Sequence, residues 1–257
     1  MIFSRQNRSI KDIRRLRRSK GDQLLVEGPH LLAEAVAAGV EIEVVLATPA
    51  FAEVEEHAEL LASVAPQLQL VRADLLEAAA DSDSPRGLVA IARVPRAGVE
   101  ALPITEQGIY VYGDGLQEPG NLGALARVAE AAGATGLALG PGSAHPNHPR
   151  AIRASAGSLL RLPVAREVGL ADLDRHLESV SPTRMALVPR GGDDVYLEEL
   201  PSGAVIVLLG GEGPGLARET LEAADVRVTL PMRAPVESLN ATVAGALVLY
   251  ELTRRRR

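Results

Sequence analysis

Short apolar segments typical of strands alternate along this chain with segments whose apolar residues recur at helical spacing. In the first half, strands are predicted at QLLVE, EIEVVLAT, LQLVRA and GLVAIARV, and helices at PHLLAEAVAAG, FAEVEEHAELLASVA and DLLEAAA. In the second half, strands are predicted at GIYVYG, TGLALG, PVAREV, RMALVP, AVIVLLG and VRVTLP, and helices at NLGALARVAEAAG, PRAIRASAGSLL, LADLDRHLESV, GLARETLEAA and the closing segment. This alternation predicts an α/β fold with a largely parallel sheet in each of two domains.

The segment VPRAGVEALPITEQG interrupts this alternation. It contains two prolines and two glycines and has no clear periodicity, which is typical of a connection between domains. A chain of 257 residues is long enough for two domains. We therefore expect one domain at residues 1–95, a linker at 96–107 and a second domain at 108–257.

The composition excludes several classes of site. The chain has no cysteine, which removes disulfides, thiolate catalysis and Cys-based zinc sites. His145 and His148 are three residues apart, but they lie in a predicted loop with no third ligand nearby, so we expect no metal site. The N-terminus has no apolar signal segment, and runs such as AVIVLL are too short to span a bilayer. We expect a cytoplasmic protein without a membrane partner.

Positive charge is concentrated at the two ends of the chain. The net charge is −6, yet residues 1–20 carry eight basic side chains against the single acid Asp12, and residues 254–257 are four arginines. Basic ends on an acidic body suit contacts with the phosphates of a nucleic acid. Frayed, solvated termini would show the same pattern, and the sequence leaves both interpretations open.

Three predicted strands of the second half end in unusual polar or glycine-rich segments: YGDGLQEPGNLGALAR, LLGGEGPGL and LPMRAPVESLN. Open parallel sheets bind ligands beyond the carboxyl ends of their strands. No segment has the G-x-G-x-x-G spacing of a dinucleotide site, and a P-loop is excluded because no lysine follows residue 20. The glycines instead suit a ligand without phosphates, such as an adenosyl group, although alone they predict only a tight turn.

Single residues in these segments are ambiguous by themselves. Asn121 is a suitable N-cap, and Arg127 lies six residues later, about 120° around the helix, where spacing alone favours a surface arginine. Taken alone, Glu212 is interpreted as an acidic side chain near the start of a helix, where a negative charge is favourable. Taken alone, Ser238 or Asn240 is interpreted as the N-cap of the last helix. That helix has an apolar stripe at Leu239, Val243, Leu247 and Tyr250, and small residues at Ala241, Ala244, Gly245 and Ala246 that permit close packing on another backbone.

Taken together, the three strand ends resemble the three motifs of the SpoU/TrmH family of RNA ribose 2'-O-methyltransferases, within the SPOUT superfamily. EPGNLGALAR resembles the first motif, LLGGEGPGL the second and LPMRAPVESLNATVAGALVLYE the third. The resemblance covers residues 108–253. Upstream, LLVEGPHLLAEAVAAG, VEIEVVLAT and SPRGLVAIARV resemble the L30e-like RNA-binding domain that often precedes it. The chain departs from the family at Ala241, Thr242 and Arg86, all outside the polar motif positions.

The resemblance implies a C-terminal trefoil knot, a homodimer, and S-adenosylmethionine (SAM) as cofactor for 2'-O-methylation of a ribose in structured RNA. Ribosomal 23S RNA is favoured as substrate; tRNA, or a non-catalytic RNA-binding or assembly factor of the same fold, are the alternatives. The implied catalytic residues are Asn121, Arg127, Glu212, Ser238 and Asn240. The implied cofactor-binding residues are Gly210, Gly211, Gly213, Leu230, Met232, Leu239 and Asn240. An arginine is ordinarily always protonated, so we expect Arg127 to position phosphate and stabilise charge rather than act as a free base.

Overall fold

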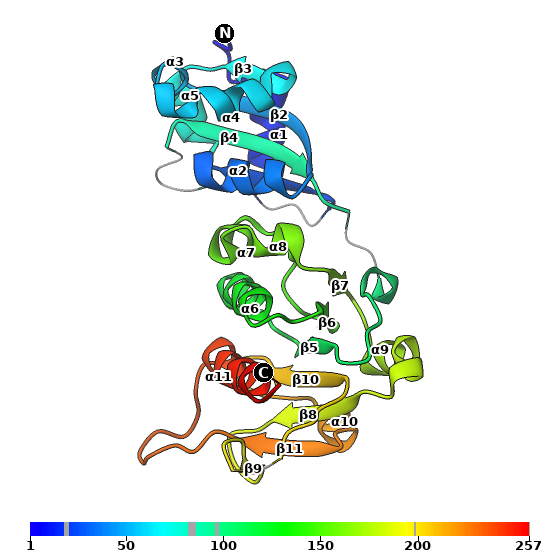
Figure 1. Cartoon of the computed structure of the whole chain (residues 1–257). Helices are drawn as coiled ribbons and strands as arrows, with labels where there is room; N and C mark the ends of the chain where they lie inside the picture. The colour runs from blue at the N-terminus through cyan, green and yellow to red at the C-terminus, as the bar shows by residue number, and fades with distance from the viewer. Residues whose placement is uncertain (18–20, 82–85, 96–97, 198, 257) are drawn as a thin grey trace. The chain divides into compact units, whose positions relative to one another are not determined.

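The chain forms two compact units, Met1–Pro95 with Asn147–Arg161, and Arg96–Pro146 with Leu162–Arg257. The computed structural model describes residues 1–17, 21–81, 86–95, 98–197 and 199–256 (Figure 1). Two residues of the basic N-terminus, Arg18 and Lys20, the linker residues 96–97 and Arg257 lie outside the described residues. Within the described residues, no helix is both long and apolar enough to cross a membrane.

The sheet of the first unit has the strand order β1 (Gln23–Glu27), β4 (Leu88–Arg93), β2 (Glu41–Ala47), β3 (Leu68–Leu70). β2 and β3 are parallel, as the alternating pattern predicted, but β4 lies between β1 and β2 and is antiparallel to both. The predicted largely parallel sheet is therefore wrong for this unit. The alternation identified the four strands, but it did not fix the direction of β4, which follows α5 (Ala73–Ala79), because apolar periodicity identifies a strand and does not encode which way it runs.

The other helices of the first unit are α2 (Pro29–Ala37), α3 (Pro49–Ala52) and α4 (Ala58–Ser63), with short 3₁₀ turns at Glu55–His57 and Ala65–Gln67. The single helix predicted over FAEVEEHAELLASVA is broken between α3 and α4, where Val54 adopts an extended backbone. α7 (Pro149–Ser155) and α8 (Ser158–Arg161) also belong to this unit. Asn147 fixes the start of that segment, since its side-chain amide donates to the carbonyls of Gly21, Asp22 and Val94.

The basic N-terminus contains a helix that the alternating pattern did not reveal, α1 (Arg8–Leu16). Asn7 caps it by accepting a hydrogen bond from the Ser9 amide. Ile10, Ile13 and Leu16 recur at helical spacing and are buried in the core of the first unit. Burial of these three side chains excludes a frayed conformation for this part of the N-terminus.

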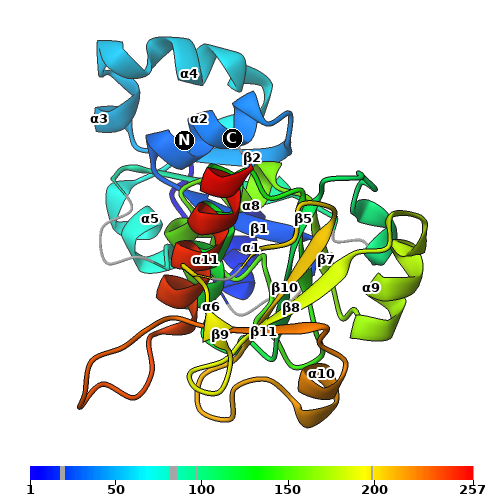
Figure 2. The same cartoon turned by 60° about the horizontal axis from the view of Figure 1, so that its bottom comes forward.

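The second unit contains a seven-stranded parallel sheet, which confirms the predicted architecture for this half of the chain. Its strand order is β7 (Val164–Arg166), β6 (Gly136–Leu139), β5 (Ile109–Asp114), β10 (Val205–Gly210), β8 (Thr183–Leu187), β11 (Val226–Thr229), β9 (Asp193–Asp194). In Figures 1 and 2, α6 (Pro119–Ala131) and α11 (Ala241–Arg255) lie side by side on one face of this sheet. α9 (Leu170–His176) and α10 (Arg218–Glu222) cover the other face, with short 3₁₀ turns at Val99–Ala101 and Glu178–Val180.

α11 buries Gly245, Val248, Leu249 and Leu252 and exposes Val243, Leu247 and Tyr250. The Cβ of an alanine at Gly245 would lie only 2.8 Å from a methyl carbon of Leu209 and 3.2 Å from one of Leu125, so glycine permits α11 to approach β10 and α6. The stripe of Leu239, Val243, Leu247 and Tyr250 keeps between 38% and 55% of its side-chain surface exposed. The stripe predicted from the sequence is therefore present, and the described residues leave it only partly covered.

The C-terminal arginines are anchored within the second unit. Arg254 and Arg255 form ion pairs with Glu251, and Arg255 also donates to the carbonyls of Val195 and Tyr196. Arg256 donates to the carbonyls of Gln107, Pro201 and Gly203. These three arginines hold the end of α11 in place. The sequence had left open contacts with nucleic-acid phosphates or a frayed terminus, and it did not predict this anchoring role.

Candidate active site

A cavity of about 520 Å³ lies at the carboxyl ends of β10, β8 and β11 in the second unit. All seven residues expected to bind a cofactor line it: Gly210, Gly211, Gly213, Leu230, Met232, Leu239 and Asn240. Glu212 and Ser238 also line it. The structure thus brings the second and third strand-end segments, which are distant in the sequence, around one space.

Sequence analysis missed part of the wall of this cavity. Leu187, Val188 and Pro189, at the end of β8, line it together with Pro214, Leu216 and Leu221. The sequence could have indicated this part of the wall, because RMALVP was predicted as a strand of the same parallel sheet. Its carboxyl end therefore lies at the same edge of the sheet as the three strand-end segments. No polar motif marked that strand end, because these residues contribute only apolar surface.

The glycines of the second segment are required by close backbone contacts. A Cβ on Gly210 would lie 2.1 Å from the carbonyl carbon of Gly215, and one on Gly211 would lie 2.2 Å from the carbonyl oxygen of Gly115. Gly213 and Gly215 have φ angles of 94° and 74°, a region that favours glycine. The turn is therefore a tightly folded wall of the cavity in which no larger residue fits at Gly210 or Gly211.

Asp114, the last residue of β5, fastens this turn to the sheet. Its carboxylate oxygen Oδ2 accepts from the amide of Ala217 at 2.8 Å, and its backbone oxygen accepts from the amide of Gly211 at 2.9 Å. Neighbouring Tyr112 is buried, and this burial, together with the charge of Asp114, raises the pKa of Tyr112 to about 12.

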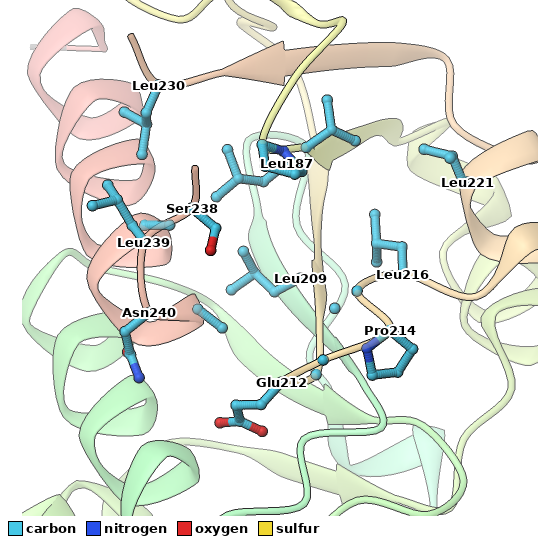
Figure 3. Close-up of a pocket in the computed structure, with 18 of the residues that line it drawn as sticks. Leu187, Leu209, Glu212, Pro214, Leu216, Leu221, Leu230, Ser238, Leu239 and Asn240 are labelled. Carbon is cyan, nitrogen blue, oxygen red and sulfur yellow. The ribbon is translucent and has the colours of Figure 1, made fainter. Parts of the chain in front are cut away.

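The cavity has an apolar interior and a polar side. Leucines dominate the interior: Leu187, Leu209, Leu216, Leu221, Leu230 and Leu239. Figure 3 shows the Ser238 hydroxyl pointing into the space between Leu239 and Leu209, with Glu212 and Asn240 below it. Such a space suits a flat apolar ring held by backbone groups, with polar chemistry at one end.

A chain of side-chain hydrogen bonds joins all three strand-end segments on this polar side. Asn121 Nδ2 donates to Glu212 Oε1, and Asn240 Nδ2 donates to Asn121 Oδ1 at 3.2 Å. Asn240 also caps α11, because its Oδ1 accepts from the amides of Thr242 and Val243. The capping role that the sequence suggested for Asn240 and its place among the site residues are therefore both real.

Asn121 does not cap α6, contrary to the interpretation of the sequence. The cap is Glu118, whose Oε1 accepts from the amide of Gly120, and Pro119 begins the helix. Asn121 lies within the first turn instead. Its side chain is thereby free to link Glu212 and Asn240.

Arg127 stands apart from this network. It lies on α6 six residues after Asn121, and its side chain is exposed. Within the described residues, neither Arg127 nor the Ser238 hydroxyl makes a hydrogen bond or ion pair. The structure thus brings Asn121, Glu212 and Asn240 together and leaves the Arg127 guanidinium directed to solvent. No cluster of three His, Cys, Asp or Glu side chains able to hold a metal occurs among the residues described.

Comparison with known proteins identifies this arrangement. Residues 108–250 match the SpoU rRNA Methylase family. The chain belongs to the SpoU rRNA methylase family. Residues 7–90 match a second family, the MRM3-like substrate binding domain.

Relatives of the SpoU family resemble this chain over nearly its full length. A protein of Synechocystis named as a tRNA/rRNA methyltransferase is 32% identical, over 99% of this chain and 93% of its own. The 23S rRNA (guanosine(2553)-2'-O)-methyltransferase RlmP of Bacillus subtilis is 28% identical, over 98% of both chains. The crystal structure of the SpoU methyltransferase AviRb from Streptomyces viridochromogenes, in complex with AdoMet, superposes with a TM-score of 0.88 at 26% identity over 98% of both chains.

Proposed function

We propose that this SpoU-family protein uses SAM to methylate the 2'-hydroxyl of a ribose in RNA, with 23S ribosomal RNA as the favoured substrate. The observation that carries the proposal is the hydrogen-bonded chain Glu212–Asn121–Asn240 beside a cavity lined by the second and third motifs. Methyltransferase names and bound AdoMet among full-length relatives support the same reaction.

The cavity fits the cofactor in size and in chemistry. Its volume of about 520 Å³ lies within the range of small-molecule sites. The leucines supply an apolar surface for an adenine ring, and the turn at Gly210 and Gly211 exposes backbone groups without intervening side chains. SAM would supply an activated methyl group on a sulfonium. The side of SAM opposite the glycine turn would be held by Leu230, Met232, Leu239 and Asn240.

The polar residues would then prepare the ribose. A ribose hydroxyl is a poor nucleophile and must lose its proton as the methyl transfers. Arg127, the exposed cation on α6, is proposed to hold the adjacent phosphate and to stabilise the developing charge on the oxygen. Glu212, Asn121 and Asn240 would orient the ribose, and Ser238 directs its hydroxyl at the same space.

RNA recognition is assigned to the first part of the chain. We propose that residues 1–95 form the RNA-binding domain, 96–107 the linker and 108–257 the catalytic domain, in which residues 147–161 differ by belonging to the first compact unit. The match of residues 7–90 to a substrate-binding domain supports this division. α1 adds a face of Lys11, Arg14 and Arg15 that is exposed to solvent and suited to phosphates.

We also propose that the protein is a homodimer and acts in the cytoplasm, where it would meet ribosomal RNA. The support for dimerisation is the exposed apolar stripe of α11, which a second copy of the same helix would cover. Leu239 belongs to this stripe and also lines the cavity, so a dimer interface would adjoin the site. The trefoil knot implied by the family stays a prediction.

Calorimetric titration of the full chain with SAM tests the reaction, and absence of binding would refute it. Mapping of ribose methylation in total RNA from cells with and without the gene tests the substrate. A missing methyl group in 23S RNA is the expected result. A missing methyl group only in tRNA would keep the reaction and overturn the favoured substrate.

A further inference from the structure

Two threonines of α11 donate hydrogen bonds to opposite ends of α6. Thr242 Oγ1 donates to the backbone carbonyl of Asn121 at 3.0 Å, and Thr253 Oγ1 donates to that of Ala132 at 2.7 Å. The two threonines are 11 residues apart, and so are the two carbonyls, which corresponds to about three helical turns. The parallel helices α6 and α11 are therefore held in register at both ends.

The two ends differ in what the threonines hold. Thr253 contacts the end of α6 that is remote from the cavity. Thr242 contacts the first turn of α6, at the residue whose side chain joins Glu212 and Asn240. Its own backbone amide donates to Asn240 Oδ1 at 2.9 Å. Thr242 thus contacts both asparagines of the network, one through its hydroxyl and the other through its amide.

The Thr242 hydroxyl is buried, so the loss of its hydrogen bond should have a measurable effect. The residue is only 9% exposed, so water replaces the lost hydrogen bond poorly when the hydroxyl is removed. Without this bond, the backbone at Asn121 loses its hydrogen bond to α11 and is held by the α6 helix and by the side-chain bonds of Asn121. Errors of about 1 Å in the placement of reacting groups cost rates on the order of 100-fold.

We propose that Thr242 is a positioning residue for methyl transfer. Its hydroxyl fixes the first turn of α6 against the first turn of α11, and so sets the geometry of the Glu212–Asn121–Asn240 network. Thr242 touches neither the cavity nor the reacting atoms, and it acts through Asn121. This inference rests on the proposed function.

The test compares Thr242→Val, which removes the hydroxyl at nearly constant volume, with the matched variant Thr253→Val at the other end. Each is measured in the full chain for thermal stability, SAM affinity, kcat and KM. We expect both variants to lower Tm, and only Thr242→Val to lower kcat, on the order of 10- to 100-fold, with SAM affinity nearly unchanged. Thr242→Ser keeps the hydroxyl and should restore most of the lost kcat.

Two results would overturn the proposal: an unchanged kcat in Thr242→Val, or an equal loss of kcat in Thr253→Val, which would indicate a general packing effect. A measurement that does not depend on activity separates this proposal from the proposed function. The side-chain amide NMR signals of Asn121 and Asn240 should shift in Thr242→Val and stay in place in Thr253→Val. Signals that do not move in Thr242→Val refute the positioning role, whereas a wild-type protein that binds no SAM refutes the function.

Discussion

The side-chain amide of Asn240 donates to the side-chain oxygen of Asn121 at 3.2 Å, and the two residues are 119 positions apart in the chain. Each stands in the first turn or at the cap of a helix, α6 for Asn121 and α11 for Asn240. Asn121 continues the contact to Glu212. One bond thus connects the first and third motifs, and a second connects the first to the second.

Asn240 has two functions that substitutions can separate. Asn240→Ala removes the cap of α11, which should cost about 1 kcal/mol of stability, and also removes the bond to Asn121. Asn240→Ser retains a capping oxygen but is too short to reach Asn121. We expect both variants to lose methyl transfer and only the alanine variant to be clearly destabilised. Equal activity of Asn240→Ser and wild type would show that capping is the whole role of Asn240.

Arg127 should matter for the reaction and not for cofactor binding. Arg127→Ala is expected to lower kcat by 100-fold or more, on the order of the loss of one transition-state donor. SAM affinity measured by calorimetry should stay close to that of wild type. Arg175→Ala removes another exposed arginine, on α9, and serves as the control. Full turnover in Arg127→Ala would refute the assigned role.

The basic face of α1 should contribute to RNA affinity. Deletion of the N-terminus is a poor test, because Ile10, Ile13 and Leu16 belong to the core. The double variant Lys11→Gln, Arg14→Gln neutralises two exposed cations that make no ion pair within the described residues. It should weaken RNA binding and lower the slope of log affinity against log salt by about 1.4 to 1.8.

The control for α1 is Arg72→Gln, in which the replaced arginine is already paired with Asp74. Its salt slope should match that of wild type. An unaltered slope in the double variant would show that α1 does not contact phosphates.

The exposed stripe of α11 should mediate self-association. Val243→Glu places a charge in the centre of the stripe and should convert a dimer to a monomer in sedimentation equilibrium. Ile104→Glu alters a similarly exposed apolar residue outside α11 and should leave the mass unchanged. A wild-type protein that is monomeric at micromolar concentration contradicts the proposed dimer.

Stability at acid pH should depend on Glu251. Arg254 and Arg255 hydrogen-bond to its carboxylate and lower its pKa from 4.5 to about 2. A lowered pKa in the folded state means that the charged carboxylate stabilises the fold fully above about pH 4.5, and that this contribution is lost as the pH falls toward 2. Tm values of wild type and Glu251→Gln should therefore differ at pH 6 and converge as the pH falls from about 4.5 toward 2. A constant difference across this range would show that the charge of Glu251 is not responsible.

Much of the site was predictable from the sequence because its residues are marked by type and spacing. Glycines at 210 and 211 are required by backbone contacts, so they had to appear as glycines in the sequence. Most elements of the second sheet follow from apolar periodicity, which is a local property. The same local rules failed for α1, because a high density of charged residues obscured its three apolar positions.

The sequence by itself determined the alternating α/β elements, the three polar strand ends and the resemblance that joins them. Only the tertiary structure decided that β4 runs antiparallel between β1 and β2 and that Asn121 is a link and not a cap. It also decided that Arg254, Arg255 and Arg256 anchor the last helix, and that α11 buries Gly245 while exposing Val243. Periodicity shows that a helix has an apolar stripe, whereas the closest approach of neighbouring backbones decides which face is buried. These outcomes depend on contacts between residues far apart in the chain, which local patterns do not encode.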